Sequence, residues 1–466
     1  MNKTPKNLPE PLPSFIGKLT LQDQFIEHDV NPMALIDQQY IESIPSMTKN
    51  LIKIICNRCG NQTQSLIGKI DCKRCDRTHS YCKKCIQMGR VLECTPMYQW
   101  IGPQFTYPPQ MNACNWDGTL TNAQQRAADR ATLSVIEKSN LLIWGVCGAG
   151  KTEMLFPAIT KAIELGERIC LATPRSDVVR ELTPRFQEVF PSISIQSLYA
   201  GSEHVFEGAQ LTISTTHQLI HYSHTFDTMI IDEVDAFPYH GDDMLPFVTH
   251  RAVKKNSTTI YLTATPRKDD VTNMKNGTLP FVFVPRRYHG IDLPVPTFQL
   301  SFQLQSSLQV GKLPPSFYQW LQQRTKKERQ LLIFVPTISL AEKILRHTQA
   351  SLVKEKAALS EERVTFVHAK DDTRKEKVHQ FREKQLDVLI TTAILERGVT
   401  FPSIDVAIID AGHEVFDEAA LVQIAGRAGR SKDDPSGEVV FFHDGKSRAM
   451  VQAKKSIIKM NKMKEL

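Results

Sequence analysis

The sequence predicts an α/β fold in which a small cysteine-rich module precedes two tandem domains, each built on a parallel sheet. Short apolar runs alternate with helical patterns along residues 116–466, as expected for parallel strands that are buried on both faces. A single glycine-rich turn follows the first of these runs, and three CxxC pairs lie upstream of it. With 466 residues and 41% hydrophobic content, the chain can form two or three separate cores.

Four segments follow from these patterns. Residues 1–45 are expected to be a loosely ordered N-terminal extension, because four prolines within the first 13 residues oppose a regular helix. Residues 46–115 form a zinc-binding module (the cysteine module), residues 116–290 the first domain and residues 291–466 the second domain. No run approaches the ~20 apolar residues of a membrane helix, and the N-terminus lacks the apolar core of a signal peptide. We therefore expect a soluble protein that reaches a membrane only through a partner.

The cysteines of the module have the spacing of metal ligands. Two CxxC turns supply the four thiolates of a tetrahedral Zn²⁺ site, whereas disulfides are not expected in a chain without a secretory signal. Three pairs are one too many for one ion. Either one pair is spare, or two zinc ions bind with His79 and Cys94 as the seventh and eighth ligands. The candidate metal ligands are Cys56, Cys59, Cys72, Cys75, Cys82 and Cys85.

Positive charge is concentrated around these cysteines. Residues 51–94 carry nine Lys/Arg against three Asp/Glu, which is most of the net charge of +7. This excess indicates either a DNA-binding surface or compensation for the negative charge of a zinc–thiolate cluster. The sequence leaves both interpretations open.

The glycine-rich turn predicts a phosphate-binding site. The apolar run Leu141–Trp144 leads into GVCGAGKT, which fits the pattern GxxxxGK[ST] and precedes a helical pattern. Its glycines allow backbone N–H groups to approach phosphate oxygens, Lys151 brings a positive charge to the β- and γ-phosphates, and the Thr152 hydroxyl can bind Mg²⁺. The predicted contacts with ATP are Gly145, Gly148, Gly150, Lys151 and Thr152.

An acidic pair after a second buried run supplies the metal partner. Asp232 and Glu233 follow the predicted strand Thr228–Ile231. We expect Asp232 to hold Mg²⁺ through water and Glu233 to polarise the attacking water, so that both residues contact the bound nucleotide complex.

Two arginines near the end of the second domain are predicted to complete the site. Arg427 and Arg430 lie three residues apart within QIAGRAGR, where helical spacing would place them on one side of a helix. Guanidinium groups suit the γ-phosphate in the transition state. With Lys151 and Glu233, they are the predicted catalytic residues.

Other strands and one tail complete the pattern. Strands are expected at Arg168–Ala172, Gln330–Val335, Arg363–Val367, Asp387–Ile390 and Val406–Ile409. Residues 446–466 carry seven Lys/Arg with interleaved apolar residues and predict an amphipathic helix. That helix either packs on the second domain or binds a membrane or DNA.

The order of these motifs resembles that of the superfamily 2 helicases over residues 117–445. LTNAQ ending at Gln124 is similar to the adenine-sensing element, and LTATP at Leu262–Pro266 is similar to the element that couples hydrolysis to domain movement. The resemblance implies two RecA-like domains, with Gly398 in a coupling motif that contributes to the nucleotide site. It also implies backbone contacts with DNA from Arg175, Thr215, Thr216, Thr337, Thr391 and Thr392.

Within that superfamily, the DEVD box, the ERGVT segment and the upstream cysteines most resemble the ComFA family of late competence ATPases. The resemblance implies an ATPase with ATP and Mg²⁺ as cofactors and single-stranded DNA as partner. It further implies a cytoplasmic protein, peripheral at the inner face of the cell membrane, that works with a DNA-uptake channel and other competence proteins. The alternatives are a PriA-like replication-restart helicase and a zinc-dependent DNA-binding scaffold that uses ATP as a switch.

Overall fold

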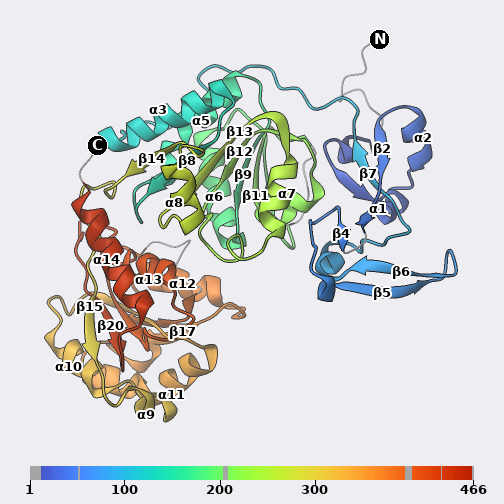
Figure 1. Cartoon of the computed structure of the whole chain (residues 1–466). Helices are drawn as coiled ribbons and strands as arrows, with labels where there is room; N and C mark the ends of the chain where they lie inside the picture. Colours follow the sequence, from blue (N-terminus) through green and yellow to red (C-terminus); the bar gives the residue numbers. More distant parts are fainter. Residues whose placement is uncertain (1–11, 51–52, 203–207, 394–400, 432, 464–466) are drawn as a thin grey trace. The chain divides into compact units, whose positions relative to one another are not determined.

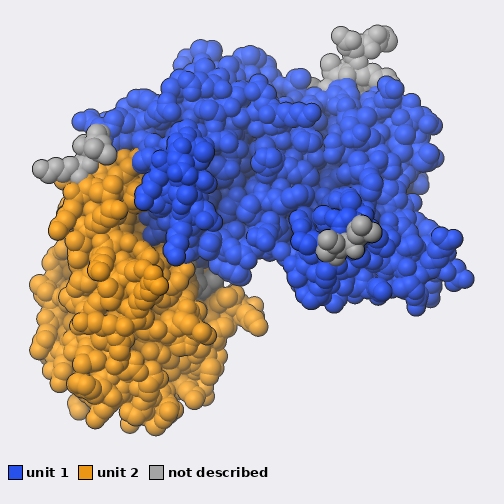
Figure 2. Space-filling view, viewed as in Figure 1, with its two compact units in different colours: residues 1–143, 152–282 blue, residues 144–151, 283–466 orange. Residues whose placement is uncertain are grey.

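A computed structural model of the chain describes residues 12–50, 53–202, 208–393, 401–431 and 433–463. The chain forms two compact units (Figure 2). The first unit is Met1–Ile143 with Thr152–Val282, and the second is Trp144–Lys151 with Phe283–Leu466. The N-terminal elements and most of the first domain therefore belong to the first unit, while the glycine-rich turn belongs to the second.

The N-terminal region is folded from residue 12, which differs from the expected loose extension. Strands β1 (Leu19–Leu21) and β2 (Ile41–Ile44) pair antiparallel with β7 (Met97–Trp100) (Figure 1). Pro32 occupies the first turn of α2 (Pro32–Asp37), where its missing N–H forfeits no helical hydrogen bond. The other elements here are η2 (Leu12–Phe15), α1 (Gln22–Glu27), β3 (Met47–Lys49), β4 (Ile54–Cys56), η3 (Gln64–Leu66), β5 (Ile67–Cys72), β6 (Arg77–Cys82) and η4 (Lys83–Met88).

The first domain is built on a seven-stranded sheet of order β10-β11-β9-β12-β13-β8-β14. The pairs β10–β11, β11–β9, β9–β12 and β12–β13 are parallel, and β9 and β11 are buried along their whole length, as predicted. The strands are β8 (Leu141–Gly145), β9 (Ile169–Thr173), β10 (Ile195–Leu198), β11 (Leu211–Thr215), β12 (Phe226–Ile231), β13 (Val253–Thr263) and β14 (Phe281–Val284). The helices are α3 (Asn122–Glu137), α4 (Lys151–Met154), α5 (Phe156–Glu164), α6 (Ser176–Val189), η5 (Thr216–His221), α7 (Met244–Ala252) and α8 (Lys268–Lys275).

The second domain contains a six-stranded sheet of order β15-β20-β19-β16-β18-β17, parallel throughout. The predicted α/β fold with two parallel sheets is therefore confirmed. The strands are β15 (Thr297–Leu300), β16 (Gln330–Phe334), β17 (Val364–Val367), β18 (Val388–Thr391), β19 (Ile404–Ile409) and β20 (Val439–His443). The helices are α9 (Leu304–Gln309), α10 (Pro315–Gln323), α11 (Ile338–Lys354), η6 (Glu361–Arg363), α12 (Arg374–Arg382), α13 (Glu418–Ala425) and α14 (Arg448–Lys462).

The basic C-terminal helix α14 packs within the second domain against α13. Met450, Ala453 and Ile457 are fully buried, and the Ser456 hydroxyl donates to Glu418 Oε1 at 2.6 Å. Of the two interpretations of this tail, packing on the second domain is confirmed. None of the helices among the described residues is long and apolar enough to cross a membrane.

A buried ion-pair network holds the start of β19. Asp405 has no exposed surface and pairs with Arg324 at 2.7 Å and with Arg329 at 3.2 Å. Arg329 also pairs with Asp434 at 2.6 Å, and these interactions hold the pKa of the Asp434 carboxyl well below its usual range. Because both guanidinium groups are almost fully buried, Arg324 depends on the carboxylate of Asp405 for charge compensation, and Arg329 on those of Asp405 and Asp434.

Replacing Asp405 with asparagine should therefore destabilise the second domain by about 3–5 kcal/mol, because two buried guanidinium groups lose their shared counterion. The measurement is hydrogen exchange of the backbone amides of β16 and β19, followed by mass spectrometry. Glu342→Gln removes the exposed 3.9 Å pair with Arg346 and should change stability by less than about 0.5 kcal/mol. If the backbone amides of β16 and β19 were equally protected from exchange in the two variants, the assigned role of the network would be contradicted.

Candidate functional site

The glycine-rich turn has the backbone conformation that a phosphate-binding loop needs. It runs from Gly145, the last residue of β8, to Lys151, the first residue of α4. Gly148 and Gly150 have φ values of +81° and +71°, which side chains rarely adopt. The ammonium group of Lys151 folds back to donate to the Gly145 carbonyl at 3.1 Å. The lysine thus lies over the loop, where an anion held by the loop N–H groups would meet its charge.

The acidic pair lies directly after the buried strand β12. Asp232 Oδ1 accepts a hydrogen bond from the Glu233 N–H at 2.8 Å, and Glu233 has a φ of +55°. The Oε2 atom of Glu233 is buried and has no hydrogen-bond partner among the described residues. A buried carboxylate oxygen without a partner is costly unless water or a cation occupies the space beside it. The pair therefore fits an Mg²⁺-associated water site.

Asp235, two residues further on, links this loop to β13. Its carboxylate accepts from the Thr263 hydroxyl at 2.8 Å and from the Thr265 hydroxyl at 2.5 Å, and it is fully buried. Arg267 also donates to the Asp235 carbonyl at 2.7 Å. Asp235 was not among the predicted site residues. It is the fourth residue of DEVD, and its two hydroxyl partners are the two threonines of the TAT sequence at residues 263–265. This contact makes the acidic loop and the LTATP segment one hydrogen-bonded unit.

Arg427 and Arg430 lie in a turn that follows α13, so the prediction that they share one side of a helix is wrong. Helix α13 ends at Ala425, and Gly429 adopts a φ of +65°. Arg427 is 1% exposed, and Arg430 Nε donates to the Gly426 carbonyl at 3.0 Å. The positive φ of Gly429 turns the chain between the two arginines.

A buried arginine that the sequence analysis missed holds this turn. Arg287 donates to the carbonyls of Gly426 at 3.2 Å and Ala428 at 2.8 Å, and also to that of Gly429. Burial, together with the charge of Arg430, lowers the pKa of Arg287 to about 10. These carbonyls lie in the turn directly after the C-terminus of α13, where positive charge is favourable. Nothing in the local spacing around Arg287 indicates this distant partner.

The glycine-rich turn and the arginine turn meet within the second unit. The Cys147 thiol lies 3.0 Å from Gln423 Oε1, and a side chain at Gly426 would collide with Cys147. Residues 144–151 and the QIAGRAGR motif are thus brought together, as the prediction of a shared site requires. Gly398 lies outside the described residues.

The remaining predicted nucleotide and DNA contacts follow strand ends or begin helices. Gln124 accepts from the Thr121 N–H at 2.8 Å and closes the N-terminus of α3, while Arg175 pairs with Asp177 at 2.7 Å at the start of α6. Thr215 ends β11, and the buried hydroxyl of Thr216 has no hydrogen-bond partner among the described residues. Arg175, Thr215 and Thr216 lie at the same edge of the sheet of the first domain, because Thr215 of β11 pairs with Thr173 of β9.

In the second domain, Thr337 is exposed and caps α11, and Thr392 follows β18 and is half-buried. Thr391 differs, because it is fully buried and its hydroxyl donates to the Val367 carbonyl at 3.1 Å. That side chain joins β18 to β17 and is not open to a DNA strand. The prediction that Thr391 contacts DNA therefore conflicts with its burial.

The structure sorts the cysteines into two groups. Cys56, Cys59, Cys82 and Cys85 form one group whose Sγ atoms all lie within 4.8 Å of one another, and a second group contains Cys72, Cys75 and Cys94. In the first group Cys56 Sγ lies 3.8 Å from Cys85 Sγ, and Cys59 Sγ lies 3.5 Å from Cys82 Sγ. Four sulfurs at about 2.3 Å from a tetrahedral zinc ion lie about 3.8 Å apart, far beyond a disulfide bond. All four cysteines are fully buried, so the group fits a closed structural zinc site.

Two arginines, the buried Arg58 and the half-buried Arg251, are associated with the four-cysteine group. Arg58 lies within the first CxxC turn and donates to the carbonyls of Met88 at 2.7 Å and Gly89 at 3.0 Å. Arg251 of α7 donates to the Arg58 carbonyl and to the Ile220 carbonyl at 2.7 Å. Burial lowers the pKa of both guanidinium groups, and nearby thiolates oppose that shift. A zinc ion with four thiolates carries a charge of about −2, which matches two guanidinium groups.

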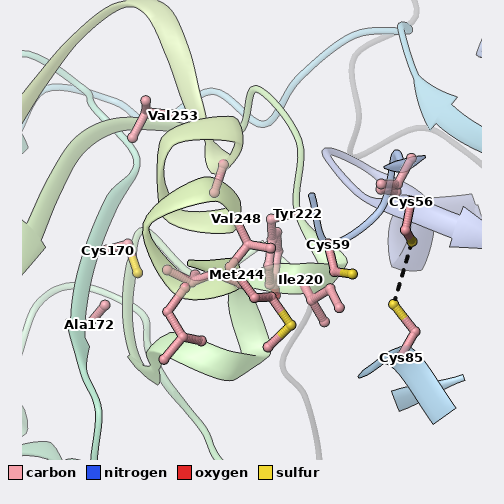
Figure 3. Packing of buried hydrophobic residues seen from close by; sticks show 14 of the residues in the cluster. Cys56, Cys59, Cys85, Cys170, Ala172, Ile220, Tyr222, Met244, Val248 and Val253 are labelled. Atoms are coloured by element: carbon pink, nitrogen blue, oxygen red, sulfur yellow. Dashed lines mark hydrogen bonds between the residues drawn. The ribbon is translucent and has the colours of Figure 1, made fainter. Parts of the chain in front are cut away.

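These contacts attach the cysteine module to the first domain. Arg58 Nη2 lies 3.3 Å from His221 Nδ1 at the end of η5, and burial with the neighbouring cations lowers the pKa of His221 to about 3. The neutral ring can therefore accept from the guanidinium group. Figure 3 shows the cysteines beside Ile220 and Tyr222, which belong to the same buried cluster. Part of the basic excess of residues 51–94 thus compensates the cysteine group, as the second interpretation of that excess predicted.

Replacing Arg58 with methionine should loosen this attachment by at least about 2 kcal/mol, because the variant loses charged hydrogen bonds and one of the two compensating charges. Limited proteolysis, together with hydrogen exchange of the backbone amides of η4 and η5, measures the strength of this attachment. The matched control is Arg90→Met, which removes the same charge from an exposed position and should leave both signals unchanged. Wild-type protection of η5 in the Arg58 variant would refute the electrostatic role.

Comparisons with known proteins place these features in a family. Residues 10–99 match the competence protein ComFA N-terminal domain, residues 117–268 the type III restriction enzyme res subunit, and residues 315–432 the helicase conserved C-terminal domain. The fold is similar to that of Saccharomyces cerevisiae Dbp5 bound to RNA and ADP BeF3, with a TM-score of 0.55, 18% identity, and coverage of 74% of this chain and 88% of that chain. The two parallel-sheet domains are therefore RecA-like, and the chain is an ATP-hydrolysing enzyme of the helicase type.

Two relatives match nearly the whole chain. The competence protein ComFA of Bacillus subtilis (strain 168) is 42% identical over 96% of this chain and 92% of that protein. The competence protein ComFA of Streptococcus pneumoniae (strain ATCC BAA-255 / R6) is 35% identical over 96% of this chain and 98% of that protein. With its cysteine module, acidic loop and arginine turn in the order that the sequence analysis described, this chain belongs to the ComFA family of competence proteins.

Proposed function

We propose that this protein is a motor that uses ATP hydrolysis to move along single-stranded DNA and to drive DNA import during competence. The observation that carries the proposal is the buried Oε2 of Glu233, which has no hydrogen-bond partner in the described part of the chain and lies beside Asp232 at the end of a parallel strand. A carboxylate oxygen held in this way is suited to orient a water molecule for attack on a phosphate. Membership in the ComFA family supports the competence role.

Each nucleotide-site residue has a distinct part in this proposal. Gly145, Gly148 and Gly150 let the loop N–H groups reach phosphate oxygens, and Lys151 turns from the Gly145 carbonyl to the β- and γ-phosphates. Thr152, and Asp232 through a water molecule, would hold Mg²⁺, which would neutralise charge at the phosphates. Glu233 holds the attacking water and accepts its proton. Gln124 reads the adenine, and Gly398 belongs to the coupling motif.

Arg427 and Arg430 are proposed to stabilise the charge that develops on the γ-phosphate. Both lie in or directly after the turn that Arg287 holds through three carbonyls, so their backbone is held in place without nucleotide. A fixed backbone reduces the ordering that the guanidinium groups must undergo during the reaction. The contact of Cys147 with Gln423 supports a shared site, because it joins the two motifs through neighbouring residues.

We propose that DNA is held through its backbone at the strand ends of both domains. Arg175 would grip phosphates in the first domain, and Thr337 and Thr392 in the second. Thr215 and Thr216 lie at the same edge, but their side chains are buried, as that of Thr391 is. Arg175 would exchange its Asp177 partner for a phosphate, an ion-pair exchange that is accessible at a half-buried site. Backbone contacts carry no sequence information, which suits a motor that must travel over any DNA.

DNA uptake also requires partners at the membrane. We propose that the protein lies in the cytoplasm, peripheral at the inner face of the cell membrane. There it would work with a DNA-uptake channel and other competence proteins. The names of the relatives support the competence role on which this placement rests. The replication-restart alternative is not favoured, since the ComFA relatives match over 96% of the chain.

Replacing Lys151 with alanine should reduce ATP turnover by at least about 100-fold, because the charge that meets the β- and γ-phosphates is lost. Phosphate release measures turnover, and circular dichroism verifies the fold. Lys161→Ala removes a surface lysine that pairs with Glu164 and should retain wild-type turnover. Normal turnover in the Lys151 variant would refute the nucleotide site.

Single-stranded DNA should raise the rate of phosphate release more than duplex DNA or RNA at the same salt concentration. Because phosphate contacts release counterions, the affinity for DNA should fall linearly with the logarithm of salt concentration. A rate of phosphate release that none of the three nucleic acids changes would contradict the proposed motor. ATP binding without steady turnover would instead support the scaffold alternative.

A further inference from the structure

The second cysteine group lies apart from the four-cysteine group and has ligand geometry of its own. The Sγ atoms of Cys72, Cys75 and Cys94 all lie within 4.8 Å of one another, and those of Cys72 and Cys94 are 3.7 Å apart. Sulfur ligands of a tetrahedral zinc ion have a separation of about 3.8 Å. A disulfide would require about 2 Å, and all three residues are free thiols. The distances therefore match shared coordination of one ion.

The backbone around Cys72 and Cys75 is shaped like that of the buried group. In the first CxxC turn, Gly60 follows Cys59 with a φ of +72°, and its N–H donates to the Cys56 carbonyl at 2.8 Å. In the second turn, Asp76 follows Cys75 with a φ of +50°, and its N–H donates to the Cys72 carbonyl at 2.9 Å. Aspartate is among the few side chains that enter this conformation readily. Both turns consequently present two thiols from one tight knuckle.

Cys94 is brought to this knuckle by pairing along β6. The Glu93 N–H donates to the Ser80 carbonyl at 2.9 Å, and the Ser80 N–H donates back to Glu93 Oε2 at 2.9 Å. Lys49 pairs with the same carboxylate at 2.5 Å, and Leu92 forms a β-bridge with Tyr81. The residue before Cys94 is thus fixed by three interactions. The proximity of Cys94 to Cys72 is built into the fold.

His79 is the candidate for the fourth donor. Its Nε2 lies 3.0 Å from Cys75 Sγ, outside the group of three thiols whose sulfur atoms are all within 4.8 Å of one another, and it pairs with Ile70 of β5 in the β5–β6 ladder. Three thiolates and one imidazole form a common zinc ligand set. Such a site carries a charge of about −1, and Lys73, Arg74 and Arg77 in the same hairpin offset it.

Exposure separates the two groups. The four cysteines of the buried group have no exposed surface, whereas Cys75 and Cys94 are exposed and Cys72 is half-buried. A ligand that water and competing thiols can reach is displaced more readily than a buried one. The two groups therefore differ in how fast a bound ion can leave.

We propose that Cys72, Cys75, Cys94 and His79 form a second zinc site whose ion exchanges with solution faster than that of the four-cysteine site. The site holds the tip of the β5–β6 hairpin to the segment that carries Cys94. It does not depend on the proposed motor activity.

Metal content and release test this site in the full-length protein, equilibrated with zinc sulfate and freed of unbound metal by gel filtration. Wild-type protein should contain two zinc ions per chain and release them to a chelator in two phases, one at least tenfold faster than the other. Cys94→Ser should contain one ion and lose the fast phase, with an unchanged circular dichroism spectrum. Cys114→Ser, whose half-buried thiol belongs to neither group, should retain both ions.

His79→Gln should keep the slow phase and speed the release of the other ion, because three thiolates remain. Wild-type protein with a single zinc ion and a single release phase would overturn the proposal. So would a Cys94→Ser variant that retains both ions and both phases. The release kinetics of the wild type decide the question even if a variant fails to fold.

Discussion

The carboxyl ends of parallel strands determine where the functional residues of this chain lie. In the first domain, β8 leads into the glycine-rich turn, β12 into Asp232 and Glu233, and β11 into Thr216. In the second domain, β16 leads towards Thr337, and Phe334 pairs with Thr391 at the end of β18. Because the carboxyl ends of all strands in a parallel sheet lie at one edge, residues that are far apart in the sequence lie close together there. The chemistry proposed for the protein follows from that constraint.

A second interaction extends this edge to the cysteine module. Arg58 of the first CxxC turn contacts His221 at the end of η5, and η5 begins at Thr216. Arg58 and Arg251 therefore join the four-cysteine group to the segment that follows β11. Zinc would hold the four cysteines as thiolates, and the net charge of about −2 of that cluster would balance the two guanidinium groups, so metal binding and the attachment of the module are linked electrostatically.

Much of this arrangement could be predicted from the sequence, because the patterns are local. The apolar runs gave strands such as β9 and β18 to within one residue, and the glycines of the phosphate loop appear at positive φ. Long-range contacts could not be predicted. Spacing cannot tell which CxxC pairs share an ion, since the β5–β6 hairpin brings Cys82 to Cys59 and leaves Cys72 beside Cys94. The turn that carries Arg427 is likewise held by hydrogen bonds from Arg287, which is about 140 residues away in the chain.

ATP-driven movement along single-stranded DNA is tested most directly by the displacement of streptavidin from biotinylated oligonucleotides. A motor that pulls on the DNA backbone should remove streptavidin from one end of the strand faster than from the other, and only while ATP is hydrolysed. Displacement that needs no ATP, or no displacement from either end despite rapid DNA-stimulated hydrolysis, would contradict the proposed motor.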